Sequence, residues 1–315
     1  MKVTALAGGV GGAKLLVGLD RLLPATDLTA IVNVGDDAGI YGVHVSPDVD
    51  IVTYWLAGIA DTQRGWGIKG DTFTVVDALG VLGEENWFQL GDRDLATCIF
   101  RTNRLREGVA LSHVTEQITR SLGMEARVLP ASDDPVRTHV VTDDGRVLPF
   151  QEYFVKERTA PEVVEIRYEG IDSAKPATGV LDAIVEADAI VVCPSNPVLS
   201  VAPILELPGV RSALVSHPLV MAVSPIVAGS ALKGPADRLL RSLGGESRAS
   251  WVANLYRDFC DVFVVDAQDA EEVEAAAAWG PRAVALDTIM ADHDASARLA
   301  GELLKIATDQ VDQKG

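Results

Sequence analysis

Cysteine is scarce in this chain, and long apolar runs are missing from it. The 315 residues include only Cys98, Cys193 and Cys260, and none of them belongs to a CxxC pair. This set provides neither a complete disulfide framework nor a structural zinc site, and it is typical of a reducing compartment. No apolar run approaches the roughly 20 residues needed to cross a bilayer, and the glycine-rich start does not fit a signal peptide. We therefore expect a cytoplasmic protein without a membrane partner.

Positive charge is scarce as well. Lys and Arg number 27 against 45 Asp and Glu, which gives a formal net charge of −18. Such a chain repels nucleic acid, because it has no surplus of cations to replace the counterions of a polyanion. We expect no nucleic-acid partner, and an anionic small ligand would need a local device to hold it. Disorder is excluded as the main state, since 48% of the residues are hydrophobic and 23% are charged.

The first residues of the chain predict a βαβ unit. A buried strand at Val3–Ala7 precedes the glycine-rich turn Gly8–Gly12, a helix from about Ala13 to Leu23 and a second strand at Leu28–Val34. This order implies two parallel strands joined by a right-handed crossover.

Four later segments continue the strand pattern. Each is a continuous apolar run, which is typical of strands that are covered on both faces. They are Ala189–Cys193, Val220–Val223, Val262–Val265 and Ala283–Leu286. The sequence therefore predicts an α/β fold with a doubly wound, mainly parallel, Rossmann-like sheet.

The middle of the chain has a different pattern. Helical patterns cover Val49–Ile59, Thr72–Leu82, Asp92–Leu105 and Val114–Leu122. A β-hairpin follows, with strands at Arg137–Thr142 and Val147–Tyr153 around the turn Asp143-Asp144-Gly145. We interpret residues 48–169 as a helical and β-hairpin insertion in a core formed by residues 1–47 and 170–308. We expect the polar tail 309–315 to fray.

The glycine-rich turn is the first candidate for a binding site. Glycines after a first strand let backbone N–H groups approach a phosphate at a helix N-terminus. Gly9 and Gly11 match the start of a dinucleotide fingerprint, but Lys14 stands where the third glycine belongs. The P-loop signature Gly-Lys-Ser/Thr is absent too. A phosphate-contacting loop and a tight turn packed under the sheet both stay open, and the βαβ context favours the loop.

Four aspartates form the second candidate. Asp36 and Asp37 follow the second strand, whereas Asp48 and Asp50 open a helix. Asp48 taken alone fits an ordinary helix cap. Mg²⁺ prefers carboxylate oxygens together with phosphate oxygens and water, and a spare carboxylate is suited to take a proton from a hydroxyl nucleophile. The four carboxylates together therefore indicate a magnesium site.

Polar turns follow other predicted strands. Ser195 and Asn196 come directly after one core strand, and Ser224-Pro225 comes after another. In open α/β sheets, ligands bind at the carboxyl ends of the strands. Because Gly8–Gly12 and Gly35–Asp37 also follow strands, we expect all four segments to lie on one rim.

Arg93 stands at the start of a predicted helix, within the segment Leu90–Asp94. A cation gains nothing from the helix dipole at this end, so its position indicates an anionic ligand.

The five histidines of the chain show no metal-ligand spacing.

Nine segments carry a resemblance to a known family. They are GGVGGAK (8–14), NVGDD (33–37), SPDVD (46–50), RGWG (64–67), LGDRDLAT (90–97), LPASDDPVRTHV (129–140), FQEY (150–153), PSNPVLSVAPIL (194–205) and AVSPIVAGSALKGPAD (222–237). In order and spacing they resemble the 2-phospho-L-lactate transferases of coenzyme F-420 biosynthesis. The resemblance extends almost from one end of the chain to the other.

The resemblance implies a phosphoryl transfer. Members of this family join a guanosine-diphosphate-linked three-carbon acid to the deazaflavin Fo. The terminal ribityl hydroxyl of Fo attacks the phosphorus next to the acid, GMP leaves, and (dehydro) coenzyme F-420-0 forms. The acid is phospholactate, phosphoenolpyruvate or phosphoglycerate, depending on lineage. The family requires Mg²⁺, and a homodimer is expected.

The same resemblance implies roles for individual residues. Asp48 and Asp50 are the expected catalytic residues, with contact to the Fo hydroxyl and general-base help, and Arg93 would contact Fo or the transferred phosphate. The expected metal ligands are Asp36, Asp37 and Asp50. The residues expected to bind the substrates are Gly9, Gly11, Gly12, Lys14, Ser195, Asn196, Asp48, Asp50 and Arg93. Local positive charge would come from Lys14, Arg93 and Lys233.

Two alternatives stay open. A sister family of nucleotide-sugar-binding regulators shares the glycine-rich start and the PSN-type loop, and its members would bind without transfer. The Asp48/Asp50 and Gly91–Asp94 segments favour the enzyme. An NAD-dependent oxidoreductase is suggested by the glycine turn alone, and the defective fingerprint counts against it.

Overall fold

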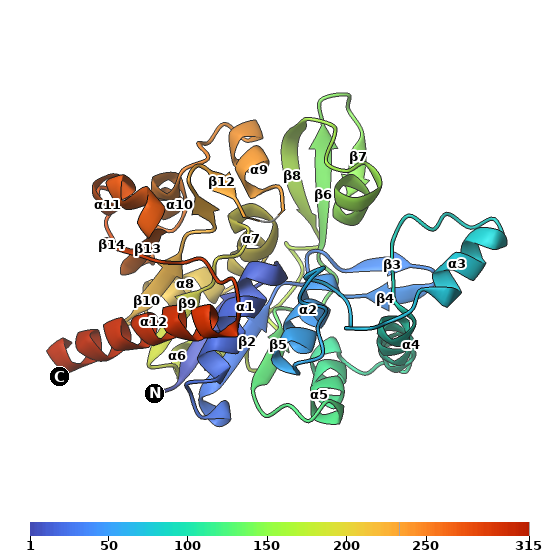
Figure 1. Ribbon diagram of the computed structural model, residues 1–315, viewed down its shortest axis with the longest axis horizontal. Helices are drawn as coiled ribbons and strands as arrows, with labels where there is room; N and C mark the ends of the chain where they lie inside the picture. The colour runs from blue at the N-terminus through green and yellow to red at the C-terminus, as the bar shows by residue number, and fades with distance from the viewer. Residues whose placement is uncertain (233, 315) are drawn as a thin grey trace.

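A seven-stranded sheet forms the centre of the protein in the computed structural model, which describes residues 1–232 and 234–314 (Figure 1). All neighbouring strands are parallel, in the order β14-β13-β10-β9-β1-β2-β5. The strands are β1 (Val3–Ala7), β2 (Leu28–Val32), β5 (Arg127–Pro130), β9 (Ala189–Val192), β10 (Val220–Val223), β13 (Val262–Asp266) and β14 (Arg282–Leu286). The predicted parallel α/β fold is therefore confirmed.

The strand order reverses between β1 and β9. The chain adds β2 and β5 on one side of β1, and the four later strands on the other side. Val3 pairs with Leu28 of β2 and with Ala189 of β9, so β1 is an inner strand of the sheet. In open α/β sheets, ligands bind outside the carboxyl ends of the strands at such a switch point. The turns that follow β1 and β9 therefore mark the expected site.

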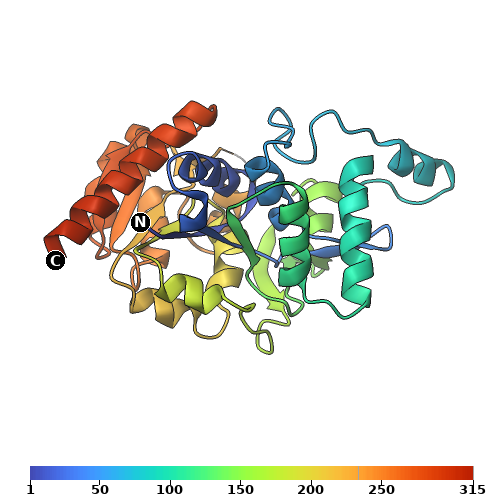
Figure 2. The same cartoon turned by 90° about the horizontal axis from the view of Figure 1, so that it is seen from below.

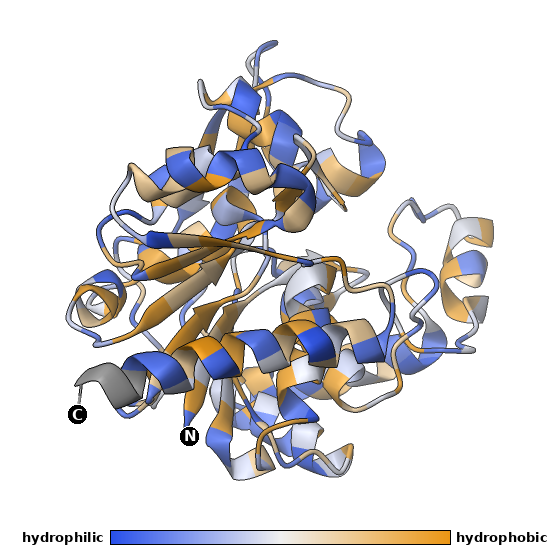
Figure 3. Ribbon diagram, turned by 60° about the vertical axis from the view of Figure 1, so that its left-hand side comes forward, coloured by the Kyte–Doolittle hydropathy of each residue, from blue (hydrophilic) through white to orange (hydrophobic). Residues whose placement is uncertain are grey.

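Helices cover both faces of the sheet. Every residue of β1, β9, β10 and β13 is buried, which explains their continuous apolar sequences (Figure 3). Helices α1 (Gly9–Asp20), α2 (Pro47–Leu56) and α12 (His293–Lys314) lie on one face, and α6 (Val180–Val185) and α8 (Val210–Val215) lie on the other (Figure 2). In the described part of the chain, no helix combines the length and the apolar character that crossing a membrane requires.

Smaller units complete the fold. An antiparallel sheet of β6 (Arg137–Thr142), β7 (Val147–Pro149) and β8 (Val163–Glu169) projects from the body, as does α3 (Thr74–Val81) (Figure 1). Two hairpins pair β3 (Ala38–Ile40) with β4 (Val43–Val45), and β11 (Ile226–Val227) with β12 (Ser230–Ala231). The other α-helices are α4 (Asp92–Arg106), α5 (Leu111–Ser121), α7 (Ala202–Leu205), α9 (Ala236–Ser242), α10 (Ala249–Leu255) and α11 (Val273–Ala277). Short 3-10 or π-helical turns cover Ala25–Asp27, Glu152–Lys156, Pro197–Val201 and Ala267–Glu272.

Two segments differ from the expected organisation. The sequence places residues 48–169 in an insertion, but Arg127–Pro130 within this range forms the edge strand β5 of the central sheet. Pro130 is tolerated there because an edge strand has no further neighbour that needs its missing N–H. Helix α12 continues to Lys314, so most of the expected tail is helical, and its fraying stays a prediction. Gly315 lies outside the described residues.

Candidate functional site

A cavity of about 730 Å³ opens at the carboxyl ends of the central strands. Gly8, Ser195 and Ser224, which follow β1, β9 and β10, contribute to its lining, and so does Asp36 after β2. The four segments expected on one rim thus line one cavity. Another part of the wall is aromatic and consists of Trp66, Phe88, Phe150 and Phe154.

The glycine-rich turn is fixed by side chains from two other elements. Gly8 precedes α1, and its N–H donates to Ser195 Oγ at 3.1 Å, while Ser195 Oγ donates back to the Gly8 carbonyl at 2.8 Å. The N–H of Gly9 donates to Asp48 Oδ1 at 2.8 Å. Gly9 has a φ of +65°, a left-handed conformation that glycine adopts without strain. The turn therefore presents a carboxylate-bound helix N-terminus to the cavity.

Gly11 and Gly12 are required mainly by packing. A Cβ at Gly11 would lie 2.3 Å from the Pro194 carbonyl oxygen, and one at Gly12 would lie 2.7 Å from Ser195 Oγ. Gly11 still lines the cavity, whereas the buried Gly12 is not part of its lining. Gly12 is therefore not placed to contact a substrate in this cavity. The turn is tightly packed, as one alternative expects, and its contact with a phosphate stays a prediction.

Lys14 and Asn196 line the cavity but already have partners. Lys14 Nζ donates to the Met290 carbonyl at 2.6 Å and lies 6.0 Å from the centre of the Trp55 ring. Asn196 Oδ1 accepts hydrogen bonds from the N–H groups of Val198 and Leu199, both at 3.0 Å, so it caps the following turn. Both residues line the cavity, and their contact with a substrate stays a prediction. Lys233, expected to add positive charge, lies outside the described residues.

Asp48 is not a helix cap. It stands in the first turn of α2, and Asn33 Nδ2 donates to its Oδ2 at 2.9 Å, while Gly9 binds its other oxygen. Asp48 thereby joins α2 to the ends of β1 and β2. Burial is the main cause that raises its pKa, to about 6. Asn33 belongs to the NVGDD segment, but no sequence pattern indicates this bridging role.

Asp36 and Asp37 lie beside Asp48 in the interior. Asp37 Oδ2 accepts from Ser46 Oγ at 2.9 Å and contacts His44 Nε2 at 2.7 Å. Among the described residues, Asp36 Oδ1 and Asp37 Oδ1 are buried without a hydrogen-bond partner. Burial raises the pKa of Asp36 well above its usual value, and the negative charge of Asp48 raises it further. Buried carboxylates with unused oxygens are a donor set that fits a hard divalent cation.

Asp50 has a different environment from the other three aspartates. Arg101 of α4 binds both of its oxygens, with Nη1 at 3.0 Å from Oδ2 and Nη2 in contact with Oδ1. Burial raises the pKa of Asp50, while the Arg101 charge acts in the opposite direction. Asp50 lines the cavity, but Arg101 binds both of its oxygens. Asp36 Oδ1, in contrast, has no hydrogen-bond partner among the described residues. Arg101 was not expected from the sequence, although Asp94, Cys98 and Arg101 recur at helical spacing.

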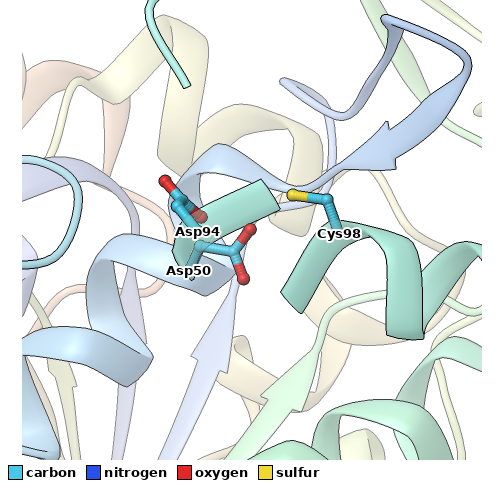
Figure 4. A group of neighbouring side chains, drawn as sticks. All are labelled: Asp50, Asp94 and Cys98. Atoms are coloured by element: carbon cyan, nitrogen blue, oxygen red, sulfur yellow. The ribbon is translucent and has the colours of Figure 1, made fainter. Parts of the chain in front are cut away.

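Asp50 also lies close to Asp94 and Cys98 (Figure 4). One ligand atom from each of the three lies within 4.8 Å of the others, as in a metal site. However, Arg101 already neutralises Asp50, and burial raises the pKa of the Cys98 thiol, so a thiolate is not available. Asp94 accepts from the Tyr54 hydroxyl at 2.8 Å, and burial together with the Asp50 charge raises its pKa to about 7. We therefore regard Asp50 and Asp94, which line the cavity, as part of its polar wall rather than as ligands of a metal centre.

Arg93 lies outside this arrangement. Its side chain is 57% exposed, contacts Asp71 at 3.7 Å and donates to the Lys69 carbonyl, and it is not part of the cavity lining. The expected contact of Arg93 with Fo or phosphate therefore has no support in this structure. The buried cation is instead Arg101, which lies further along the same helix α4.

The fold and the site define an α/β protein with a carboxylate-rich, partly aromatic cavity at the switch point of a parallel sheet. The family described as 2-phospho-L-lactate transferase CofD matches residues 3–303. A phosphoenolpyruvate transferase of Streptomyces griseus is 43% identical over 315 residues, covering 98% of this chain and 99% of its own. A 2-phospho-L-lactate transferase of Methanosarcina acetivorans is 40% identical over 295 residues, covering 94% and 95%. The chain thus belongs to the 2-phospho-L-lactate transferase CofD family, as the sequence motifs predict.

A solved structure shares the fold. The crystal structure of a UPF0052 family member from Bacillus halodurans matches with a TM-score of 0.67 and covers 96% of this chain and 98% of its own. The two sequences are 19% identical, so this similarity concerns the fold alone.

Proposed function

We propose that the protein transfers a phospho-three-carbon-acid group from a guanosine-diphosphate-linked donor to the terminal ribityl hydroxyl of the deazaflavin Fo. In this reaction a bond forms between the ribityl oxygen and the phosphorus next to the acid. The bond from that phosphorus to the GMP oxygen breaks, and GMP leaves with the electron pair. The observation that carries the proposal is the single cavity in which the Gly8–Gly11 turn, buried carboxylates and an aromatic wall meet.

The donor fits the end of the cavity that the glycine-rich turn borders. The N-terminus of α1 favours negative charge there, and Lys14 adds a cation on the same lining. Ser195 and Asn196 hold the neighbouring turn after β9 in place, so that little reorganisation is needed when a diphosphate binds.

Mg²⁺ fits best between Asp36 and Asp48. Both carboxylates line the cavity, and Asp36 Oδ1 is buried without a described partner. The expected ligands Asp37 and Asp50 fit less well, because Asp37 is not part of the cavity lining and the Arg101 guanidinium binds both oxygens of Asp50. Neutralising the charge that develops on the phosphates is the chemistry that the ion supplies when bound.

Fo fits the aromatic part of the cavity. Phe150 and Phe154 are stacked with ring centres 5.4 Å apart, and Trp66 and Phe88 extend the apolar wall. A flat heterocycle gains both apolar burial and ring stacking in such surroundings. With its ring there, Asp50 would accept a hydrogen bond from the attacking hydroxyl and take its proton as the new bond forms.

The test is turnover by the purified protein with Mg²⁺, Fo and each of the three guanylated acids. We expect release of GMP and a phosphodiester-linked product, detected by mass spectrometry. Asp48→Asn should lower turnover at least about 100-fold, whereas Asp309→Asn, on the exposed end of α12, should not. If no donor releases GMP and a nucleotide sugar binds tightly, the protein is a regulator and the proposal is wrong.

The identity of the acid needs a competition experiment. Relatives at 43% and 40% identity carry the names phosphoenolpyruvate transferase and 2-phospho-L-lactate transferase, so overall similarity does not choose between them. Equimolar donors offered together, followed by mass spectrometry of the products, report the ratio of kcat/KM values directly.

A further inference from the structure

Arg101 is a buried cation that contacts the cavity only through another residue. Its side chain is 1% exposed, and its two terminal nitrogens bind the two oxygens of Asp50. Arg101 is not part of the cavity lining, whereas Asp50 is. The pair joins α4 to α2 across the wall of the site.

The forked guanidinium of Arg101 fixes the orientation of the Asp50 carboxylate as well as neutralising its charge. Two parallel N–H···O contacts set both the position and the plane of a carboxylate, which a single-point cation such as lysine does not do. Arg101 is itself held, because Nη1 also donates to the His44 carbonyl at 3.3 Å. The carboxylate of Asp50 therefore has one orientation relative to the cavity.

Stability alone does not account for this pair. Removing two charges from water is costly, and a buried ion pair is often no better for stability than apolar residues of the same volume. Arg101 Nε is moreover buried without a hydrogen-bond partner among the described residues, which adds to the cost. An expensive arrangement that ends at a cavity-lining carboxylate points to a role in the site.

We propose that Arg101 is a positioning residue that holds the Asp50 carboxylate toward the acceptor hydroxyl and keeps it out of the metal-binding set. This inference rests on the proposed transfer to Fo. Asp50 accepts the hydroxyl proton as the oxygen–phosphorus bond forms, and Arg101 touches neither substrate. Among the four aspartates of the site, Asp36 and Asp48 thereby face the donor, and Asp50 faces the acceptor.

A double-mutant cycle tests the proposal. Arg101→Lys keeps the charge but loses the fork, and we expect kcat to fall about 10- to 100-fold, with the KM for the guanylated donor changed less than about twofold. In the Asp50→Asn background, Arg101→Lys should change kcat less than about twofold, because Arg101 acts through Asp50. Arg104→Lys is the matched control, since Arg104 lies on the same helix, 42% exposed, in an ion pair with Glu107.

Each result decides the matter. Multiplicative losses in the cycle, or an Arg101→Lys variant with wild-type kcat and only a lower melting temperature, would overturn the positioning role. If Arg101→Lys fails to fold, Asp50→Glu replaces it: this variant keeps both charges but moves the carboxylate by one methylene, and wild-type kcat for it would also overturn the role. A wild-type protein that releases no GMP refutes the proposed function, whereas an active wild type with a multiplicative cycle refutes only the role of Arg101.

Discussion

Asp48 Oδ1 accepts a hydrogen bond from the backbone N–H of Gly9 at 2.8 Å and thereby links the first turn of α2 to the first turn of α1. The two residues are 39 positions apart in the sequence. A protein carboxylate thus binds one N–H at the helix N-terminus where the sequence suggests a phosphate, and it brings negative charge to the point where the strand order reverses. The glycine turn and the acidic group are therefore one unit rather than two sites.

Gly9→Ala tests this unit. Alanine at a φ of +65° is strained by about 1–2 kcal/mol, although a Cβ would meet nothing closer than 4.0 Å. We expect the free energy of unfolding to fall by that amount. We also expect GMP release to fall at least about tenfold, because relaxing φ moves the N–H away from Asp48. Denaturant titration and single-donor kinetics measure the two effects.

Gly58→Ala is the control for this variant. Gly58 has a φ of +69°, is exposed, and would also have open space around a Cβ, so it should lose the same stability without losing activity. Equal turnover in the two variants would remove the Gly9–Asp48 contact from the site.

Much of the sheet could be predicted because its strands are continuous apolar runs. Val3–Ala7 and Val220–Val223 have the predicted bounds, since burial on both faces leaves no alternation to confuse the pattern. Strand β5 escaped prediction because its four residues, ending in Pro130, look like a turn without the neighbouring β2. The edge of the sheet is defined by pairing rather than by local sequence.

The location of the site at the strand ends could be predicted from the sequence, but the contacts between its side chains could not. Gly8, Asp36 and Ser195 line one cavity because they follow parallel strands whose ends meet, which is a property of the fold class. The choice between Arg93 and Arg101 depends instead on how α4 rotates against α2, and a sequence motif contains no such information. The motif residue Arg93 is exposed, and the unmarked Arg101 is buried against Asp50.

Asp36→Asn should stabilise the metal-free protein. Burial and the neighbouring Asp48 charge raise the pKa of Asp36, which means that its ionised form is costly in the folded state. Removing that charge should therefore raise the free energy of unfolding at pH 8 in the presence of EDTA. Mg²⁺ should raise the melting temperature of the wild type but not of Asp36→Asn. A variant that still gains stability from Mg²⁺ would show that the ion binds elsewhere.

Asp94→Asn should flatten the pH dependence of stability. The pKa of Asp94 is raised from 3.8 to about 7, so the folded protein binds this proton more tightly than the unfolded chain does. The free energy of unfolding therefore falls as pH rises from about 4 to about 7, and the full loss is present above that range. Asparagine keeps an acceptor for Tyr54 without this loss. We expect the free energy of unfolding of Asp94→Asn to exceed that of the wild type by about 2–4 kcal/mol at pH 8, and by little at pH 4.

Urea titrations at the two pH values check this expectation. Asp309→Asn serves as the reference, because it removes one exposed carboxylate from the same chain. A difference between Asp94→Asn and the wild type that is equal at pH 4 and pH 8 would mean that Asp94 titrates normally.

Phe154→Ala tests whether the aromatic wall binds the deazaflavin ring. Phe154 lines the cavity and stacks on Phe150 with an interplanar angle of 17°, so its loss removes one face against which a flat heterocycle packs. We expect the Kd for Fo, followed through the fluorescence of Fo itself without donor, to rise about 3- to 10-fold, in line with about 0.5–1.5 kcal/mol for an aromatic pair. Phe100→Ala is the control, since Phe100 is 37% exposed against 39% for Phe154 but lies outside the cavity lining. The two phenylalanines are similarly exposed and differ in whether they line the cavity. Unchanged Fo binding in Phe154→Ala, or the same change in both variants, would therefore show that the deazaflavin ring binds elsewhere.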